Sequence, residues 1–282
     1  MSIKKDPSGR RSVQVEVEVK GTPEQVWQAI ATGPGISSWF VPAKVDGRVG
    51  GALSCDFGGG MVSSAKITDW QPPHRFTAED STWLQGGPPV ATEWSVEARA
   101  GGTCIVRVVH SLFASTDDWD DQIESTEHGW PGFFRILRIY LEHHAGQRSA
   151  TMQFMAMGKD SEKETWAVLM RALGLTDPRK GQRAQIRPGG AAGITATVEC
   201  VDDLPHGYGM MMLASEPAPG AILVGSFACM GMLMATLQVY VWGNNVDAVT
   251  RDQERWQAWF ACLFPAPAAA PAAGDANSRA QA

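Results

Sequence analysis

The stretch that most constrains the fold is an amphipathic segment near the middle of the chain, residues 117–144. Five large apolar side chains recur there at the i, i+3, i+4, i+7 and i+11 spacing of one helical face: Trp130, Phe133, Phe134, Leu137 and Leu141. Polar residues fall mostly on the opposite side: Glu127, Arg135, Arg138 and Glu142. The apolar stripe is wider than a single packing seam needs. The segment therefore predicts a long helix that requires a broad, concave apolar partner.

The first strand and the first helix are predicted by two local patterns near the N-terminus. Valines alternate with polar residues over 12–20, which is typical of a strand with one solvated face. Thr22 then precedes Pro23 and stands three residues before Gln25, as in a capping box with proline at the first helical position. A helix is therefore expected to begin at Pro23 and to bury Trp27.

Residues 49–113 carry only strand and turn signals. The expected strands are 49–57, 61–70, 75–84, 90–98 and 103–113. Short turns join them, among them Gly58-Gly59-Gly60, so consecutive strands should pair as an antiparallel meander. A strand, short helices, the meander and one long helix, in that order, indicate an α+β fold rather than a doubly wound sheet.

The same order of elements restarts after Gly146. The anchor residues of the first helix recur 139 residues later with the same spacing: Ser161, Glu164 and Trp166. The first anchors of the long helix recur 126 residues later: Trp256, Trp259 and Phe260. A strand is expected before the first of these helices, at 150–157. Four more are expected between the helices, at 194–201, 208–214, 221–230 and 232–242, and the closing helix is expected at 249–263. Order and anchor residues, rather than identity, indicate two tandem copies.

This repeat divides the chain into four parts. Residues 1–11 are expected to be a disordered lead-in, and 12–146 to form the first domain. Residues 150–264 are expected to form a degenerate second domain. Residues 265–282 are rich in Ala and Pro and are expected to be a disordered tail.

Composition and charge exclude several classes of protein. Apolar residues make up 44% of the chain and charged residues 19%, which is typical of a globular protein. No apolar run is long enough to span a bilayer, and the first residues lack the apolar core of a signal peptide, so we expect a cytoplasmic protein without stable membrane insertion. The net charge of −6 argues against a nucleic-acid partner.

No metal or cofactor is predicted. The five cysteines are scattered and form no CxxC pair, so free thiols are expected at Cys55, Cys104, Cys200, Cys229 and Cys262. His143 and His144 end the long helix, but adjacent histidines point apart on a helix and do not make a metal site. The acidic run 117–121 lies where negative charge stabilises the N-terminus of the long helix.

An ordered set of short motifs in the first half resembles the SRPBCC superfamily of START, polyketide-cyclase and birch-pollen-allergen-like domains. The resemblance is greatest to the branch of the C-terminal domain of the Aha-type activator of heat-shock-protein ATPase. The motifs are Val26-Trp27, Trp39-Phe40, Val49-Gly50-Gly51, Pro72-Pro73, Gly102-Thr103, His110-Ser111, Gly129-Trp130 and Tyr140-Leu141-Glu142. The match covers about residues 12–146. The second half lacks the Gly-Gly entry and the double proline and matches in outline only.

The resemblance implies a helix-grip fold, in which the long helix lies across a curved antiparallel sheet and encloses a cavity. It also implies an apolar ligand, since family members bind lipids, sterols or polyketides, or catalyse cyclisation or hydrolysis in that cavity. We predict that the ligand contacts Trp39, Phe40, Phe57, Trp70, Trp83, Trp94, His110, Trp130, Phe134 and Leu137. The alternative for each of these residues is that it only fills the core.

Three functions remain open at this point. The first is binding of a lipid- or polyketide-like molecule without catalysis. The second is a cyclase, aromatase or hydrolase reaction in the same cavity, with His110 as acid or base. The third is a chaperone-associated interaction module, as the Aha resemblance implies. Fold alone does not choose among these functions. A homodimer is compatible with each of them.

Overall fold

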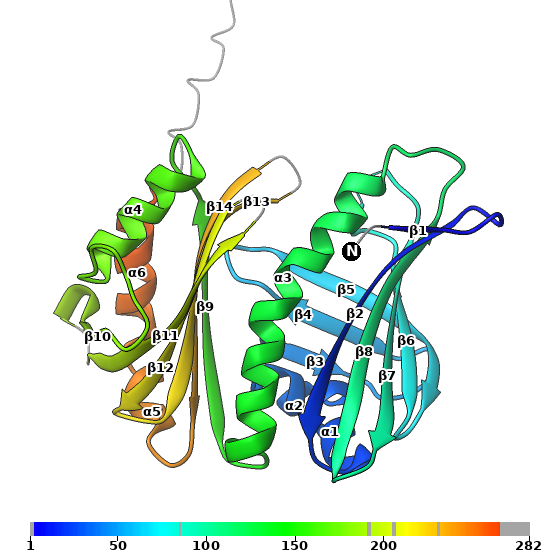
Figure 1. The fold of residues 1–282 in the computed structure, drawn as a ribbon, viewed down its shortest axis with the longest axis horizontal. Helices are drawn as coiled ribbons and strands as arrows, with labels where there is room; N and C mark the ends of the chain where they lie inside the picture. Colours follow the sequence, from blue (N-terminus) through cyan, green and yellow to red (C-terminus); the bar gives the residue numbers. More distant parts are fainter. Residues whose placement is uncertain (1–2, 85, 191–192, 205–206, 230–231, 266–282) are drawn as a thin grey trace, which may run out of the picture.

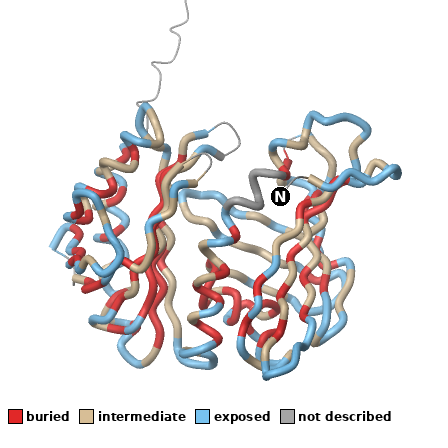
Figure 2. Tube along the Cα trace, viewed as in Figure 1, coloured by how far each residue is buried: buried red, intermediate tan, exposed pale blue. Residues whose placement is uncertain are grey.

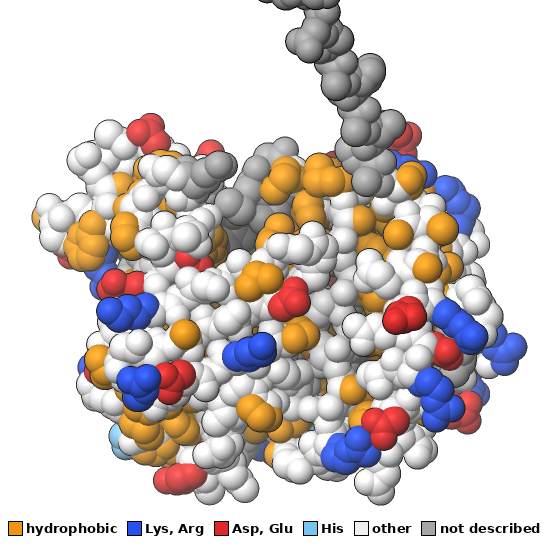
Figure 3. Space-filling view, turned by 180° about the vertical axis from the view of Figure 1, so that it is seen from behind, with side chains coloured by type: hydrophobic (Ala, Val, Ile, Leu, Met, Phe, Trp, Pro, Cys, Tyr) orange, Lys and Arg blue, Asp and Glu red, His pale blue; other side chains and the backbone are white. Residues whose placement is uncertain are grey.

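The chain folds into two antiparallel sheets with one long helix, α3, between them (Figure 1). The computed structural model describes residues 3–84, 86–190, 193–204, 207–229 and 232–265. Among these residues no helix is long and apolar enough to cross a membrane. Basic and acidic side chains are interspersed on the face seen in Figure 3, and no continuous basic area covers it.

The first sheet has eight strands in the order β1-β2-β8-β7-β6-β5-β4-β3, and all neighbours are antiparallel. Its strands are β1 (Lys4–Lys5), β2 (Arg10–Lys20), β3 (Ala43–Val45), β4 (Ala52–Asp56), β5 (Val62–Gln71), β6 (Arg75–Asp80), β7 (Val90–Arg99) and β8 (Thr103–Phe113). The predicted meander is confirmed from β4 to β8, and β2 pairs with the last strand. This arrangement is the sheet of the expected helix grip.

Two short helices close one end of this sheet, α1 (Pro23–Ala31) and α2 (Gly33–Ser37). The predicted capping box of α1 is present. The Thr22 hydroxyl accepts from the Gln25 backbone N–H at 3.4 Å, and the Gln25 side-chain oxygen accepts from the Thr22 N–H at 2.9 Å. Both bonds satisfy N–H groups that a helix leaves free at its start.

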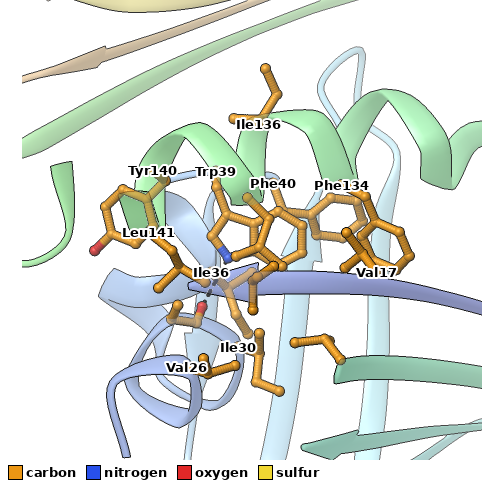
Figure 4. Packing of buried hydrophobic residues seen from close by; sticks show 14 of the residues in the cluster. Val17, Val26, Ile30, Ile36, Trp39, Phe40, Phe134, Ile136, Tyr140 and Leu141 are labelled. Carbon is orange, nitrogen blue, oxygen red and sulfur yellow. Dashed lines mark hydrogen bonds between the residues drawn. The ribbon is translucent and has the colours of Figure 1, made fainter. Parts of the chain in front are cut away.

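The helix α3 (Asp120–Ile139) continues into a π-helical turn, η1 (Tyr140–His144), and is buried on two sides. Phe134 and Leu141 point toward Trp39 and the first sheet, whereas Ile136 points away from them (Figure 4). Ile136 is nevertheless fully buried, at 0% exposure, because the second sheet covers it. The wide apolar stripe is thus explained by two partners rather than by one broad partner.

The second sheet has six strands in the order β10-β11-β12-β13-β14-β9. They are β9 (Ser149–Met157), β10 (Arg183–Ile186), β11 (Ile194–Leu204), β12 (Gly207–Glu216), β13 (Gly220–Cys229) and β14 (Met232–Trp242). β9 pairs with the last strand, β14, as β2 pairs with β8 in the first sheet, and the other strands follow in chain order. The fold is therefore α+β with two tandem copies, and the second copy has a smaller sheet.

Helices cover the outer face of the second sheet. They are α4 (Glu162–Ala172), α5 (Val246–Thr250) and α6 (Gln253–Leu263), with a 3₁₀ turn η2 (Pro188–Gly190). The predicted cap of α4 is confirmed, since the Ser161 hydroxyl accepts from the Glu164 N–H at 3.2 Å. Trp256 of α6 is 0% exposed and stacks on Phe154 with ring centroids 6.1 Å apart. The grip of the second copy is thus filled by its own side chains.

Three features differ from the sequence prediction. The lead-in 1–11 was expected to be disordered, but β1 pairs with β2, which begins at Arg10. The short strands β3 and β10 were not predicted. The closing helix is two helices, α5 and α6, rather than one over 249–263. Residues 266–282 of the expected tail lie outside the described residues, and the domain boundaries remain predictions.

The inner face of the second sheet binds the last turn of α2 and the residues that follow it. The Thr151 hydroxyl donates to the Ser37 carbonyl at 2.6 Å, and the Trp242 indole N–H donates to the Ser38 carbonyl at 2.9 Å. The Phe40 carbonyl accepts from the Tyr240 hydroxyl at 2.7 Å and from the Gln153 amide at 3.1 Å. Burial raises the pKa of Tyr240, so that its hydroxyl remains a donor.

The core of the first copy continues without a break into the second sheet. Four buried side chains of that sheet belong to the same cluster as Trp39 and Phe134: Met211, Ala221, Tyr240 and Trp242. Buried segments accordingly run from the first sheet through α3 to β14 (Figure 2). The two copies therefore share one hydrophobic core at α3.

The Gly58-Gly59-Gly60 turn between β4 and β5 lies against the free edge of β9. A Cβ at Gly58 would lie 3.0 Å from the Gln153 carbonyl oxygen, and one at Gly59 would lie 3.1 Å from that of Met155. Glycine is thus needed here both for close approach and for the positive φ values of the turn. The turn serves the contact between the two copies.

We expect Gly58→Ala to lower the free energy of unfolding by about 2 kcal/mol, through backbone strain and loss of the close contact with β9. Gly60→Ala is a matched control, because Gly60 has φ +85°, close to the +84° of Gly58, and nothing within 4 Å of the added Cβ. Urea unfolding measures both variants. An equal loss in the two variants would show that the contact with β9 contributes nothing.

Candidate functional site

Aromatic rings of α3, β7, β8 and the segment after α2 meet under α3, with Trp130 at the centre. The Trp130 ring centroid lies 5.3 Å from those of Phe40 and Trp94, 5.2 Å from that of Phe134 and 5.7 Å from that of His110. Figure 4 shows Phe40 and Phe134 on the underside of α3, beside Trp39. These distances correspond to rings in direct contact.

All ten predicted site residues lie in or beside this aromatic cluster. Seven are buried: Trp39, Phe40, Trp94, His110, Trp130, Phe134 and Leu137. Three are half-buried at its margin: Phe57, Trp70 and Trp83. Phe57 contacts Phe40, Trp70 contacts Phe76, and Trp83 contacts His110, with ring centroids 5.1–5.7 Å apart. Whether these residues bind a ligand stays a prediction.

The prediction left out three rings that belong to the cluster: Trp27, Phe76 and Phe133. Phe133 was visible in the apolar stripe of the long helix. Trp27 was assigned to the core of α1, and it also contacts Trp70 with centroids 5.0 Å apart. Phe76 is 1% exposed and stacks on Trp94, so it extends the buried aromatic surface along β6.

His110 is held by two hydrogen bonds inside the cluster. The Trp130 indole N–H donates to Nε2 at 2.9 Å, and Nδ1 lies 2.9 Å from the Thr92 hydroxyl. Since an indole can only donate, Nε2 carries the lone pair and the proton of the neutral ring is on Nδ1. Complete burial lowers the pKa of His110 to about 4. The imidazole is therefore neutral near pH 7, with both nitrogens occupied.

Thr92, the partner of His110, could have been found from the sequence. The strands β7 and β8 are joined by the turn at Gly101-Gly102, and counting back from this turn places Thr92 directly opposite His110. Directly paired residues of neighbouring strands have adjacent side chains. The missing step was to set the register before looking for a partner.

An ion cluster holds the start of α3 on the hairpin of β1 and β2. Lys5 lies 3.0 Å from Asp117 and 2.6 Å from Asp120, and Arg11 lies 2.8 and 3.2 Å from the same two carboxylates. The helix has no side-chain cap at Trp119. The acidic run thus stabilises the start of α3 through ion pairs with the hairpin, besides its effect on the helix dipole.

No group of three metal-ligating side chains occurs among the described residues. His143 and His144 have ring centroids 6.1 Å apart, and His144 stacks on Trp242 at 4.6 Å. Two surface hollows, of about 660 and 300 Å³, contain none of the ten predicted site residues in their described linings. The smaller is formed by Trp27 and Pro72-Pro73 among others, and the larger lies at the junction of the copies.

Residues 20–142 match the family model described as Activator of Hsp90 ATPase homolog 1-like protein. The first copy is a domain of this AHSA1 type. The matched residues run from the last residue of β2 into the π turn, and so include α3 and the aromatic cluster. The structure thus agrees with the SRPBCC resemblance of the sequence. No curated protein matches the chain.

Three solved structures illustrate what the chain is similar to. CalU16 from Micromonospora echinospora is 21% identical, with 50% of this chain and 83% of that chain covered and a TM-score of 0.40. The Aha1 dimer from Colwellia psychrerythraea is 21% identical, with 47% of this chain and 96% of that chain covered and a TM-score of 0.39. The di-domain ARO/CYC BexL from the BE-7585A biosynthetic pathway is 13% identical, with 91% of this chain and 99% of that chain covered and a TM-score of 0.45.

Proposed function

We propose that the AHSA1-type copy binds a small apolar molecule between its sheet and α3, without catalysing a reaction. The observation that carries this proposal is that the aromatic cluster reaches the surface. Buried rings at its centre continue into half-buried rings at its margin, such as Trp83 next to His110. Such a surface offers a ligand apolar walls and few polar groups, which is typical of small-molecule sites.

The first half of α3 is the part that moves to admit the ligand in this proposal. Pro131 has no backbone N–H, so the helix lacks one hydrogen bond there. Of the ion pairs at the start of the helix, Lys5–Asp117 is exposed, at 46% and 73%, and contributes little. Arg11–Asp120 is largely buried, at 8% and 14%, and keeps the first turn on the hairpin. Since the rings under α3 are in contact, the ligand has to displace some of them.

A tricyclic anthraquinone and palmitate serve as probes for this site. At a hundred times Kd a bound probe stabilises the fold by about 2.7 kcal/mol, so the melting temperature should rise, and the tryptophan fluorescence should change. Trp83→Ala should weaken binding at least tenfold. Trp166→Ala is the control, because Trp166 is also half-buried but stacks on Tyr208 in the second copy, with centroids 5.7 Å apart. Unchanged affinity in Trp83→Ala would refute the site.

The cyclase or hydrolase alternative is less well supported. A reacting group would have to replace the Trp130 N–H on Nε2 of His110 before that atom could take a proton. The chaperone alternative rests on the description of the family alone. Stimulation of an Hsp90 ATPase by the purified chain would favour it over the binding function.

A further inference from the structure

A hollow of about 660 Å³ lies where the two copies are joined. Its walls come from α1 and the start of α2, from the π turn η1, and from residues 145–149, which lead into β9. It shares no residue with the predicted aromatic site. Its volume is within the usual range of small-molecule pockets, which is roughly 300–1,000 Å³.

The polar groups of this hollow favour an anion. Among the described residues, its lining contains no carboxylate, and Arg148 is the one residue that carries a full charge. No hydrogen bond among the described residues engages the side-chain amide of Gln28, and that of Gln25 uses only its oxygen, on the Thr22 N–H. The side-chain N–H groups of the exposed residues Gln25 and Gln28 thus have no protein acceptor among the described residues, and Arg148 adds a positive charge to the same lining.

Among the residues that the structure describes, the Arg148 side chain pairs with Asp247, and this partner can be exchanged. Its Nη2 lies 3.0 and 3.1 Å from the two oxygens of Asp247. The side chains are 60% and 67% exposed, and ion pairs at such positions are weak. A carboxylate bound in the hollow can take the place of Asp247 on the guanidinium at little cost.

Part of the lining of the hollow is apolar. Ala29, Pro34 and Leu141 contribute carbon surface to it. Leu141 belongs to the π turn Tyr140–His144, and π turns within helices occur frequently at functional sites. The lining thus combines a charged donor group with an apolar wall.

We propose that this hollow binds a small organic anion, with its acidic group on Arg148 and the glutamine amides and its carbon skeleton on Leu141 and Ala29. This site is separate from the proposed apolar site. A ligand here contacts α1, η1 and the linker, residues 145–149, at the same time, and so stabilises the junction between the copies.

The probe is 4-fluorobenzoate, followed by ¹⁹F NMR line broadening on the full chain, with neutral 4-fluorobenzamide as its isosteric comparison. We expect saturable binding of the benzoate and at least tenfold weaker binding of the benzamide. Arg148→Gln should weaken benzoate binding at least tenfold. Asp247→Asn should strengthen it, because Arg148 is then released from its partner.

Arg179→Gln is the matched control, since Arg179 is also an exposed arginine paired with an aspartate, Asp177. It should leave benzoate binding unchanged, as should Trp83→Ala. Absence of saturable binding, equal binding of the benzamide, or an unchanged affinity in Arg148→Gln would overturn the proposal. Loss of binding in Trp83→Ala would place the probe at the aromatic site and overturn it as well.

Discussion

A fragment that ends at Gln147 is expected to have no stable fold, although it contains every residue of the AHSA1-type copy. Circular dichroism should show no cooperative melting transition near that of the full chain, and gel filtration should show aggregates. This is a large effect for the removal of a sequence that carries none of the family motifs.

The reason is the second face of α3. Ile136 and Tyr140 are at most 7% exposed in the full chain and lie in the core that includes Trp242 of the second sheet. Full burial of one large apolar side chain stabilises a fold by about 1.5–3 kcal/mol. Half-buried Phe133 and Ile139 add to this surface. The fragment therefore loses on the order of 5 kcal/mol, out of the roughly 5–15 kcal/mol that holds a domain together.

A protease site inserted near Gly146 supplies the control. Cleavage of the folded full chain cuts the linker but leaves the shared core and the four hydrogen bonds to the Ser37, Ser38 and Phe40 carbonyls in place. The two pieces should therefore stay together in gel filtration. A fragment 1–147 that melts within a few degrees of the intact chain would show that the copies are independent domains.

The sequence predicted the elements of the first copy well, because their signals are local. The alternation over 12–20 and the capping box at Thr22 each depend on neighbouring residues only, and both are confirmed. The strand 103–113 was predicted with its observed bounds. The three-residue β3 and four-residue β10 were missed, since such short strands leave no clear periodicity.

What lies on each face of an element could be predicted less well. Periodicity places the apolar residues Ile136 and Phe133 on faces of a helix, but it does not indicate which sheet each face packs against. β14 shows the same difficulty. Its residues 234–242 are all buried, including Thr236 and Gln238. These two polar residues alternate with apolar ones in the sequence, so the pattern suggests one solvated face although both faces of the strand are covered.

The candidate site was predicted as a set of residues but not as a geometry. Aromatic residue types indicated Trp39, Trp94 and Trp130 as a group, and these rings are in one cluster. Whether rings line a space or fill it depends on distances of a few ångströms, which no residue pattern encodes. The hollow at Arg148 was not predicted, because α1, α2, η1 and residues 145–149 are brought together only by tertiary packing.

The second large effect is expected at His110, and it depends on pH. Its pKa in the folded protein is lowered to about 4 by burial, whereas an unfolded histidine has a pKa of about 6.5. Between these values the unfolded chain binds a proton that the folded chain does not. The contribution of neutral His110 is therefore fully present above pH 6.5 and is lost as the pH falls toward 4, by roughly 3 kcal/mol in total.

His110→Gln separates this effect from the other groups that titrate in acid. The glutamine side chain offers Trp130 an acceptor and cannot take up the proton. The free energy of unfolding of the variant, measured in urea, should therefore fall less than that of the wild type between pH 7 and pH 4.5. His143→Gln is the control, because His143 is exposed and should keep the wild-type profile. His110→Leu leaves the buried Trp130 N–H without an acceptor and should lose about 3 kcal/mol at pH 7.5. Parallel pH profiles of wild type and His110→Gln would mean that His110 is not the buried neutral group that ties β7, β8 and α3 together.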